Sequence, residues 1–341
     1  MKLAVAIPLY NHEEYIGPAL ASLFAQSRPV DRVVIVDDGS TDRSREVVRQ
    51  WSDPRISLLT QENAGAHVAL NRAIDEAADC EFVAVLNSDD LYCPTRIEKC
   101  LGCLESHPEI QVVASALKLI DSAGVELPAT APKARWVEKV WSARRADLAE
   151  WLGIANFVKT SSNFVGRQSY FAAHPFRNYR YVHDYFFALE CALHGHLAVL
   201  DDALLLYRTH PTNTIKSAGT EAVKLETLRM NGDLLRELAP HMAGSPELRK
   251  AYTGYFRNLC GNHADFRAEI FLTLIAQLLA DNGSEALANL TAGMSPLAFP
   301  ELTAPSSGLL KKELAREKRI SRLEKSKWLR LGLKLGFIDE L

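Results

Sequence analysis

The sequence predicts an α/β protein built on a doubly wound, mostly parallel sheet with helices on both faces, followed by a helical C-terminal region. Two observations carry this prediction. Within the first 120 residues, short apolar runs alternate with longer amphipathic segments, which is typical of parallel strands joined by helices. Residues 218–292 are then rich in Leu, Ala and Glu at helical spacing.

The alternation predicts the elements of the first 120 residues in order. Five apolar runs have the length of strands buried in a parallel sheet, at residues 3–7, 33–36, 56–59, 82–86 and 111–115. Four segments between them have apolar residues at helical spacing, at residues 13–26, 42–51, 66–78 and 95–106. Pro94 stands where a helix start tolerates proline. Ligands of doubly wound sheets bind beyond the carboxyl ends of the strands, so the residues that follow each strand are the functional candidates.

Composition and charge narrow the class of protein. The chain has 341 residues, with 48% hydrophobic and 24% charged residues, which is typical of globular proteins and excludes a disordered or collagen-like chain. The net charge of −3 argues against a protein that coats nucleic acid. Six cysteines are too few and too irregular for a disulfide scaffold. Because neither a targeting signal nor a membrane-spanning segment is recognised, we expect a cytoplasmic protein.

Polar side chains gather where three of the predicted strands end. The first strand runs into residues 8–11, the second into Asp-Asp-Gly-Ser at 37–40, and the fourth into Asn-Ser-Asp-Asp at 87–90. Each segment alone also fits an ordinary turn followed by a helix cap. Carboxylates that meet at one edge of a sheet repel each other unless a cation offsets them. A divalent metal ion that bridges to phosphates therefore accounts for the pattern, with Asp89 as its candidate ligand.

Four short motifs stand at these places: AIPLYN at 6–11, VDDGSTD at 36–42, ENAG at 62–65 with NRAI at 71–74, and LNSDD at 86–90. Their order and spacing resemble the family 2 inverting glycosyltransferases, which have the GT-A fold. The resemblance covers about residues 1–215. It identifies this segment as a GT-A catalytic domain, with a nucleotide-binding half at 1–120 and an acceptor half at 121–215.

The resemblance implies a role for each motif residue. Asp38 would hydrogen-bond the base of a nucleotide, Pro8 and Tyr10 would line the pocket of that base, and Asp89 would bind Mn²⁺ or Mg²⁺ on the diphosphate. One position departs from the family, because Asn87 replaces the first acid of its Asp-x-Asp pattern. An asparagine can hydrogen-bond a ribose hydroxyl but supplies no charge. The other residues expected to contact the nucleotide sugar are Asn11, Asn63 and Ser88.

Two later segments carry further candidates. Asp184 stands near the start of a helical pattern at 181–190, where an acid also fits a helix cap or first turn. The resemblance implies instead that Asp184 is the base that takes the proton of the acceptor hydroxyl. The segment YRTHPTN at 207–213 resembles one that closes many family 2 domains. His210 therefore completes the metal site, contacts the diphosphate, or has a structural role.

Together these features predict an inverting, metal-dependent glycosyltransferase. Its expected donor is a nucleoside diphosphate sugar, and its expected acceptor is a glycan or lipid-linked hydroxyl in bacterial surface polysaccharide synthesis. A sugar-phosphate nucleotidyltransferase shares the sheet and the metal, but the chain lacks a Gly-rich signature with Arg and Lys after the first strand. A non-catalytic glycan-binding homologue is the other alternative, which Asn87 motivates.

Three further segments follow the predicted catalytic domain. Residues 216–295 predict a helical appendage that covers the domain, forms a homo-oligomer or binds a partner, and residues 296–308 predict a linker. Residues 309–341 predict a basic amphipathic helix, since 311–334 hold ten lysine or arginine residues and three glutamates. This helix is expected either to contact the inner face of a membrane peripherally or to pack on protein through Trp328.

Overall fold

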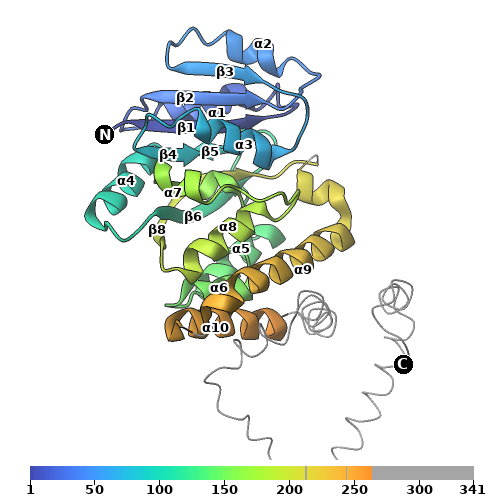
Figure 1. Cartoon of the computed structure of the whole chain (residues 1–341). Helices are drawn as coiled ribbons and strands as arrows, with labels where there is room; N and C mark the ends of the chain where they lie inside the picture. The colour runs from blue at the N-terminus through green and yellow to red at the C-terminus, as the bar shows by residue number, and fades with distance from the viewer. Residues whose placement is uncertain (212, 243, 263–341) are drawn as a thin grey trace, which may run out of the picture. The chain divides into compact units, whose positions relative to one another are not determined.

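The computed structural model describes residues 1–211, 213–242 and 244–262. Strands and helices alternate along its N-terminal part as the apolar pattern predicts (Figure 1). The strands are β1 (Leu3–Leu9), β2 (Arg32–Asp37), β3 (Ile56–Thr60), β4 (Phe82–Val85), β5 (Leu91–Tyr92), β6 (Val112–Ile120), β7 (Val165–Arg167) and β8 (Leu197–Arg208). The helices are α1 (Ile16–Phe24), α2 (Ser44–Arg49), α3 (Ala66–Asp75), α4 (Arg96–Ser106), α5 (Pro132–Ser142), α6 (Leu148–Ile154), the 3₁₀ turn η1 (Ser161–Asn163), α7 (Gln168–Ala173), α8 (His183–Leu193), α9 (Thr214–Met242) and α10 (Pro246–Asn262).

The chain divides into two compact units. The first comprises Met1–Leu234 and Glu247–His263, and the second comprises Leu235–Pro246 and Ala264–Leu341. The sheet belongs to the first unit. The predicted appendage at 216–295 is helical as far as the structure describes it, in α9 and α10. The predicted segments at 296–308 and 309–341 lie outside the described residues, and the domain boundaries stay predictions.

The sheet brings four strand ends to one edge. Its strands lie in the order β3-β2-β1-β4-β7-β6-β8-β5. Strands β1 to β4 run parallel, β6 and β8 run parallel, and β7 runs antiparallel to both β4 and β6. Because β7 reverses the direction twice, β8 points the same way as β1. The carboxyl ends of β1, β2, β4 and β8 therefore lie at the same edge of the sheet, where ligands of such sheets bind.

Helices cover both faces of the sheet, which confirms the predicted fold class. All seven residues of β1 are buried, as expected of a strand with helices on both sides. Val5 and Ile7 of β1 pack in one core with Leu20 of α1 and Leu101 of α4. The residues between them point to the opposite face, and α3 contacts β1 and β2.

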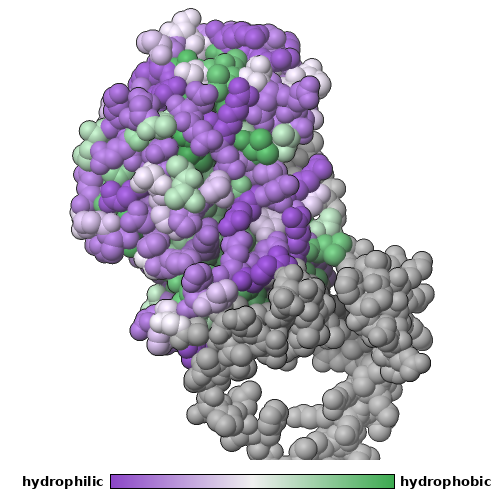
Figure 2. Space-filling view, in the orientation of Figure 1, coloured by the Kyte–Doolittle hydropathy of each residue, from purple (hydrophilic) through white to green (hydrophobic). Residues whose placement is uncertain are grey.

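Hydrophilic side chains predominate on the face of the described residues that Figure 2 shows. Hydrophobic side chains form small separate groups there. Isolated apolar residues are normal on a protein surface.

None of the described helices is long and apolar enough to cross a membrane. Among the described residues, the exposed large hydrophobic ones are Met1, Tyr10, Val68, Val125, Trp136 and Leu225.

Helices α6 and α10 approach so closely that a side chain does not fit at Gly153. A Cβ on this residue would overlap the carbonyl oxygen of Tyr255. Nearby, Asn258 Nδ2 donates to Glu150 O at 3.0 Å. The buried Tyr255 hydroxyl donates to Asn231 Oδ1 of α9 at 2.8 Å. Within the first unit, α10 thus packs against α6 and α9.

We expect Gly153→Ala to destabilise the protein by about 1–3 kcal/mol, the usual cost of overpacking, because the added methyl group meets backbone. Urea unfolding would measure this difference. Gly102→Ala is the matched control, since Gly102 lies in α4 and its Cβ would have no atom within 4 Å. Alanine there should be neutral or stabilising by up to about 1 kcal/mol. Equal stability of the two variants would contradict the close helix packing.

Candidate active site

The loops that follow β1 and β2 are tied together at the common edge of the sheet. Asn11 Oδ1 accepts a hydrogen bond from Thr41 N at 2.8 Å, and Asn11 N donates to Ser40 Oγ at 3.0 Å. Asn11 has a φ of 50°, a left-handed conformation in which asparagine is enriched. Asn11, a predicted nucleotide-sugar contact, therefore fixes the path of the loop that leads into His12.

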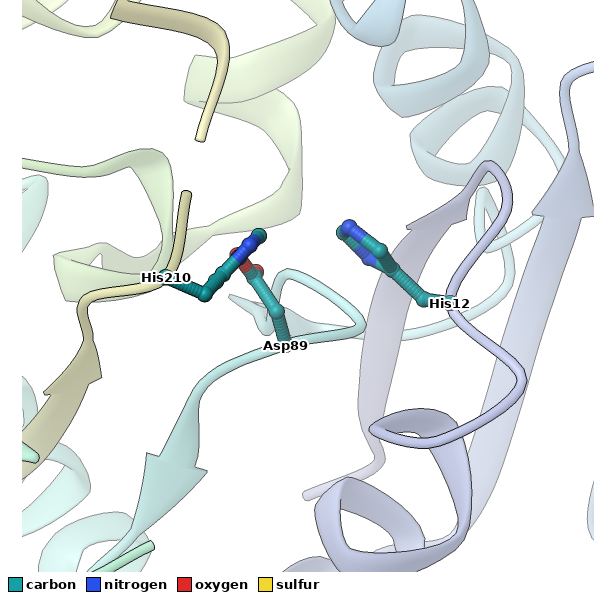
Figure 3. Close-up of side chains that lie close together, drawn as sticks. All are labelled: His12, Asp89 and His210. Atoms are coloured by element: carbon teal, nitrogen blue, oxygen red, sulfur yellow. The ribbon is translucent and has the colours of Figure 1, made fainter. Parts of the chain in front are cut away.

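Three side chains from separate loops come together at this edge: His12, Asp89 and His210 (Figure 3). One potential ligand atom of each lies within 4.8 Å of the other two. Asp89 Oδ2 and His210 Nε2 are 3.0 Å apart and share a hydrogen bond. Figure 3 shows the three side chains pointing toward one another. Two imidazole nitrogens and a carboxylate oxygen at this spacing can hold a divalent transition-metal ion.

The sequence identifies two members of this cluster and misses the third. Asp89 and His210 are predicted from the end of the fourth strand and from the YRTH segment. His12 is not predicted. A signal for it exists in the sequence, since His12 follows the first strand just as Asp89 follows the fourth. The structure places the predicted pair in direct contact. Their roles as metal ligands stay predictions.

The turn after β8 fixes His210. Its backbone N–H donates to Asn213 Oδ1 at 2.7 Å, and Asn213 Nδ2 donates to Arg208 O at 3.3 Å. Arg208 is buried, and its Nε donates to Asp89 O at 2.7 Å. The ring of Tyr15 lies 4.9 Å from that of His210. These contacts hold His210 beside Asp89, although the two residues lie 121 positions apart.

His12 is held through both its backbone and its ring. Its N–H donates to Ser44 Oγ at 2.9 Å, and its Nδ1 lies 2.7 Å from Ser88 Oγ. When Nδ1 donates its proton to Ser88, Nε2 keeps a lone pair that a metal ion can use. Burial lowers the pKa of His12, which favours the neutral ring that metal binding requires. Ser88, a predicted nucleotide-sugar contact, thus orients a candidate metal ligand.

Asp89 and Asp90 are adjacent but differ in their electrostatics. Burial pushes the pKa of Asp89 upward, but the hydrogen bond with His210 and the interactions with both histidines bring it below its usual value. Burial, together with the charge of Asp89, raises the pKa of Asp90 to about 8. Asp89 is therefore the charged member of the pair. The buried Asp90 carboxyl group accepts hydrogen bonds from Ser162 Oγ at 2.6 Å, Thr160 Oγ1 at 3.1 Å and Arg208 N at 2.9 Å.

The amide of Asn87 is engaged within the protein. Its Nδ2 donates to Thr160 Oγ1 at 2.8 Å, and its Oδ1 accepts from Ser161 Oγ at 2.8 Å. Asn87 therefore ties the loop after β4 to the segment that leads into η1. The predicted contact with a ribose hydroxyl stays a prediction.

Asp38 organises the next loop along the same edge. Its carboxylate orders the segment that contains Asn63, whose side chain is exposed. The contact of Asp38 with a nucleotide base stays a prediction, as does that of Asn63. The donors to Asp38 are Gln61 Nε2 at 2.8 Å, Ala64 N at 2.9 Å and Gly65 N at 2.8 Å.

The predicted base-pocket residues Pro8 and Tyr10 lie at the end of β1. Pro8 is buried and stands opposite Val36 of β2 in the sheet. Tyr10 follows the strand and is 46% exposed. An exposed aromatic side chain at a strand end is available to a planar ligand, and the pocket assignment stays a prediction.

Asp184 lies in the first turn of α8 and is buried. It is not the helix cap, because Val182 occupies that position. Burial raises the pKa of Asp184 to about 6, against the lowering effects of the Tyr185 N–H and the Lys159 charge. Burial raises the pKa of the partly buried Tyr207 phenol, and the charges of Asp90, Asp89 and Asp184 raise it further. The candidate base and the carboxylate of the cluster thus both act on the Tyr207 side chain.

Comparison with known proteins identifies the family. Residues 4–174, half of the chain, match the family model described as Glycosyl transferase family 2. The chain belongs to glycosyl transferase family 2. The resemblance of its motifs to this family is confirmed, and the chain has the GT-A fold. The chain spans less than two thirds of the length of the first relatives that it matches, between 28% and 63% of each.

Individual relatives agree with this assignment. The uncharacterized glycosyltransferase YibD of Escherichia coli is 41% identical over 99 residues, which is 28% of this chain and 28% of YibD. The amylovoran biosynthesis glycosyltransferase AmsE of Erwinia amylovora is 27% identical over 229 residues, covering 65% of this chain and 82% of AmsE. The mannosyltransferase PcManGT from Pyrobaculum calidifontis, solved with GDP-Man and Mn²⁺, superposes with a TM-score of 0.54 at 17% identity. This superposition covers 97% of this chain and 82% of PcManGT, and it shows a shared fold.

Proposed function

We propose that this glycosyltransferase is inverting and metal-dependent, and that it moves a sugar from a nucleoside diphosphate to a glycan or lipid-linked hydroxyl. The observation that carries the proposal is the cluster of His12, Asp89 and His210 at the carboxyl edge of the sheet. Within a family 2 domain, such a cluster offers a place for a cation that binds a diphosphate. Asn87 supplies no charge to this site, but His12 adds a ligand to Asp89 and His210.

The chemistry of these residues favours Mn²⁺ over Mg²⁺. Mg²⁺ prefers oxygen ligands and keeps several of its waters, whereas imidazole nitrogen suits transition-metal ions better. The residues that would hold the ion are His12, Asp89 and His210. A bound cation there supplies positive charge that stabilises the departing diphosphate. The presence of Mn²⁺ with GDP-Man in PcManGT supports this choice.

Asp184 is the proposed base on the acceptor side. Its carboxylate takes the proton of the acceptor hydroxyl as that oxygen attacks the anomeric carbon and the bond from sugar to phosphate breaks. A pKa of about 6 leaves the carboxyl group mostly ionised at pH 7, and this pKa is close enough to 7 for efficient proton transfer.

The proposed metal site is held in place before any ligand arrives. Ser88 positions His12 and Asn213 positions His210, so binding of the ion does not require these side chains to reorganise.

Ligand-induced thermal stabilisation tests this function. The full chain would be melted with Mn²⁺ and each of UDP, GDP, CDP, ADP and dTDP, and then with the matching nucleotide sugars. A ligand at 100 times its Kd adds about 2.7 kcal/mol of stability, which a melting curve detects. Release of the nucleoside diphosphate from the stabilising sugar donor would establish turnover. No stabilisation by any nucleotide would contradict the donor class, and stabilisation without release would favour a glycan-binding homologue.

We expect His12→Ala to weaken Mn²⁺ binding in the presence of nucleoside diphosphate by at least about tenfold, since even the loss of a residue that only orients a ligand has such effects. Electron paramagnetic resonance would follow the Mn²⁺ titration. His107→Ala is the matched control, because His107 is exposed at the end of α4. Unchanged affinity in His12→Ala would remove His12 from the ligand set and leave Asp89 and His210.

The acceptor class and the cellular location belong to the same proposal. The similarity to AmsE, an amylovoran biosynthesis glycosyltransferase, motivates a role in bacterial surface polysaccharide synthesis. A lipid-linked acceptor would bring the enzyme to the inner face of a membrane. The basic residues of 309–341, which lie outside the described residues, are the proposed peripheral contact. Homo-oligomerisation through residues 216–295 stays a prediction.

A further inference from the structure

Lys159 is held in a fixed position near the candidate base. It lies between α6 and η1 with a φ of 69°, a left-handed conformation that costs a long side chain free energy. Asn156 Oδ1 accepts a hydrogen bond from its N–H at 3.2 Å and so supports this conformation. Its Nζ lies 3.7 Å from the centroid of the Trp136 ring in α5, a cation–π contact. The loop and the indole together determine where the ammonium group stands.

The charge of Lys159 is poorly compensated. In the part of the chain that the structure describes, no carboxylate oxygen lies within 4 Å of its ammonium group. Burial lowers the pKa of Lys159 to about 8; the charge of Asp184 opposes this shift, and that of Lys133 in α5 adds to it. Lys133 precedes Trp136 by three residues in α5, so its side chain lies on the face of that helix that Lys159 contacts. A bound anion would offset the free-energy cost of keeping the half-buried ammonium group of Lys159 charged.

We infer that Lys159 and Lys133 bind an oxyanion of the acceptor, either a carboxylate or a phosphate, carried near the hydroxyl that receives the sugar. The inference rests on the proposed function, in which that hydroxyl meets Asp184. An ammonium group forms strong, charge-assisted hydrogen bonds with either oxyanion. Trp136 is 39% exposed, so the ammonium group it holds is close to the surface that an acceptor reaches.

Lys159 borders the candidate site. The next residue in the chain, Thr160, accepts a hydrogen bond from Asn87 Nδ2 at 2.8 Å. The charge of Asp184 also acts on Lys159. Because the donor diphosphate is assigned to the cluster that contains Asp89, we assign the anion at Lys159 to the acceptor that meets Asp184.

Ligand-observed NMR of the full chain, with Mn²⁺ and the stabilising nucleoside diphosphate, tests the inference by binding alone. The probes are methyl β-D-glucuronide and glycerol 3-phosphate, each compared with its neutral counterpart, methyl β-D-glucoside or glycerol. The wild-type chain should bind at least one anionic probe about ten- to a hundredfold more tightly than its counterpart. Lys159→Met should remove this preference and Lys159→Arg should keep it. Lys139→Met, which removes an exposed charge from α5, the helix that carries Trp136 and Lys133, should leave it unchanged.

The outcomes distinguish a carboxylate from a phosphate ligand, and an anion site for the acceptor from one for the donor. Preference for the glucuronide indicates a carboxylate, and preference for glycerol 3-phosphate indicates a phosphate. Equal binding of charged and neutral probes, or a preference that survives Lys159→Met, would overturn the inference. Weaker thermal stabilisation of Lys159→Met by the nucleoside diphosphate would also overturn it, by moving Lys159 to the donor site. Failure of the proposed function would be seen differently, as a lack of stabilisation of the wild-type chain by any nucleotide.

Discussion

Asp89→Ala is expected to abolish Mn²⁺-dependent transfer, with a loss in turnover of at least about a thousandfold. Asp89 is the carboxylate of the cluster, and its removal leaves only the two imidazole rings to hold the cation. Without a bound ion, the negative charge that develops on the departing diphosphate loses stabilisation of several kcal/mol, and about 1.4 kcal/mol corresponds to tenfold in rate. Transfer from the nucleotide sugar identified by thermal stabilisation would measure the effect.

The fold of Asp89→Ala should survive this change. Removing one of two adjacent buried carboxylates relieves the charge that raises the pKa of Asp90. A melting curve without ligand would verify folding. Asp79→Ala is the control for loss of an aspartate, because Asp79 is an exposed residue that pairs with Lys2 and Arg32. A folded Asp89→Ala protein with normal turnover would show that Asp89 does not bind an essential metal ion.

The elements that position Asp89 could be predicted because their signals are local. Each of β1, β2 and β4 is an apolar run that is almost entirely buried, and each connecting helix carries its own apolar stripe. Parallel strands then place their carboxyl ends at one edge without further information. This is why Asp38 and Asp89 could be assigned to the same site before any contact was known.

The rest of the site depends on pairing between distant segments. Strand β8 carries Asp201 and Asp202 in its middle, so its apolar pattern is interrupted, and its long pairing with β6 identifies it as a strand. His12 is one of several polar residues before α1, and its contacts with distant residues, among them Ser88 76 positions away, distinguish it. Its position after the first strand does not encode these contacts. Likewise, the sequence points to Asp89 but does not show how Asp90 is held, because the side chains that hydrogen-bond Asp90 stand about 70 positions further on.

Asp184→Asn is expected to lower turnover by about 10²–10⁴-fold, the usual contribution of a general base. Asparagine has the same size and can still accept the hydrogen bond that Tyr185 N donates at 2.7 Å, but it cannot take the acceptor proton. Thermal stabilisation by Mn²⁺ and nucleoside diphosphate should match that of the wild-type chain, because Asp184 stands outside the proposed metal cluster. Glu190→Gln removes a carboxylate from the same helix and serves as the control. Lost donor binding with near-normal turnover at saturation would make Asp184 a binding residue.

The pH dependence of turnover separates a base at Asp184 from a structural role. Burial raises the pKa of Asp184 to about 6, with Lys159 lowering it and Glu226 raising it. The active form is the ionised carboxylate, so turnover at saturating Mn²⁺ should fall as the pH drops below about 6 and level off above it. The decline should approach about tenfold per pH unit, as for one proton on one base. In Asp184→Asn this acidic limb should disappear, leaving a low rate that is flat between pH 5 and about 7. An unchanged limb in the variant would assign the titration to another group and place the base elsewhere.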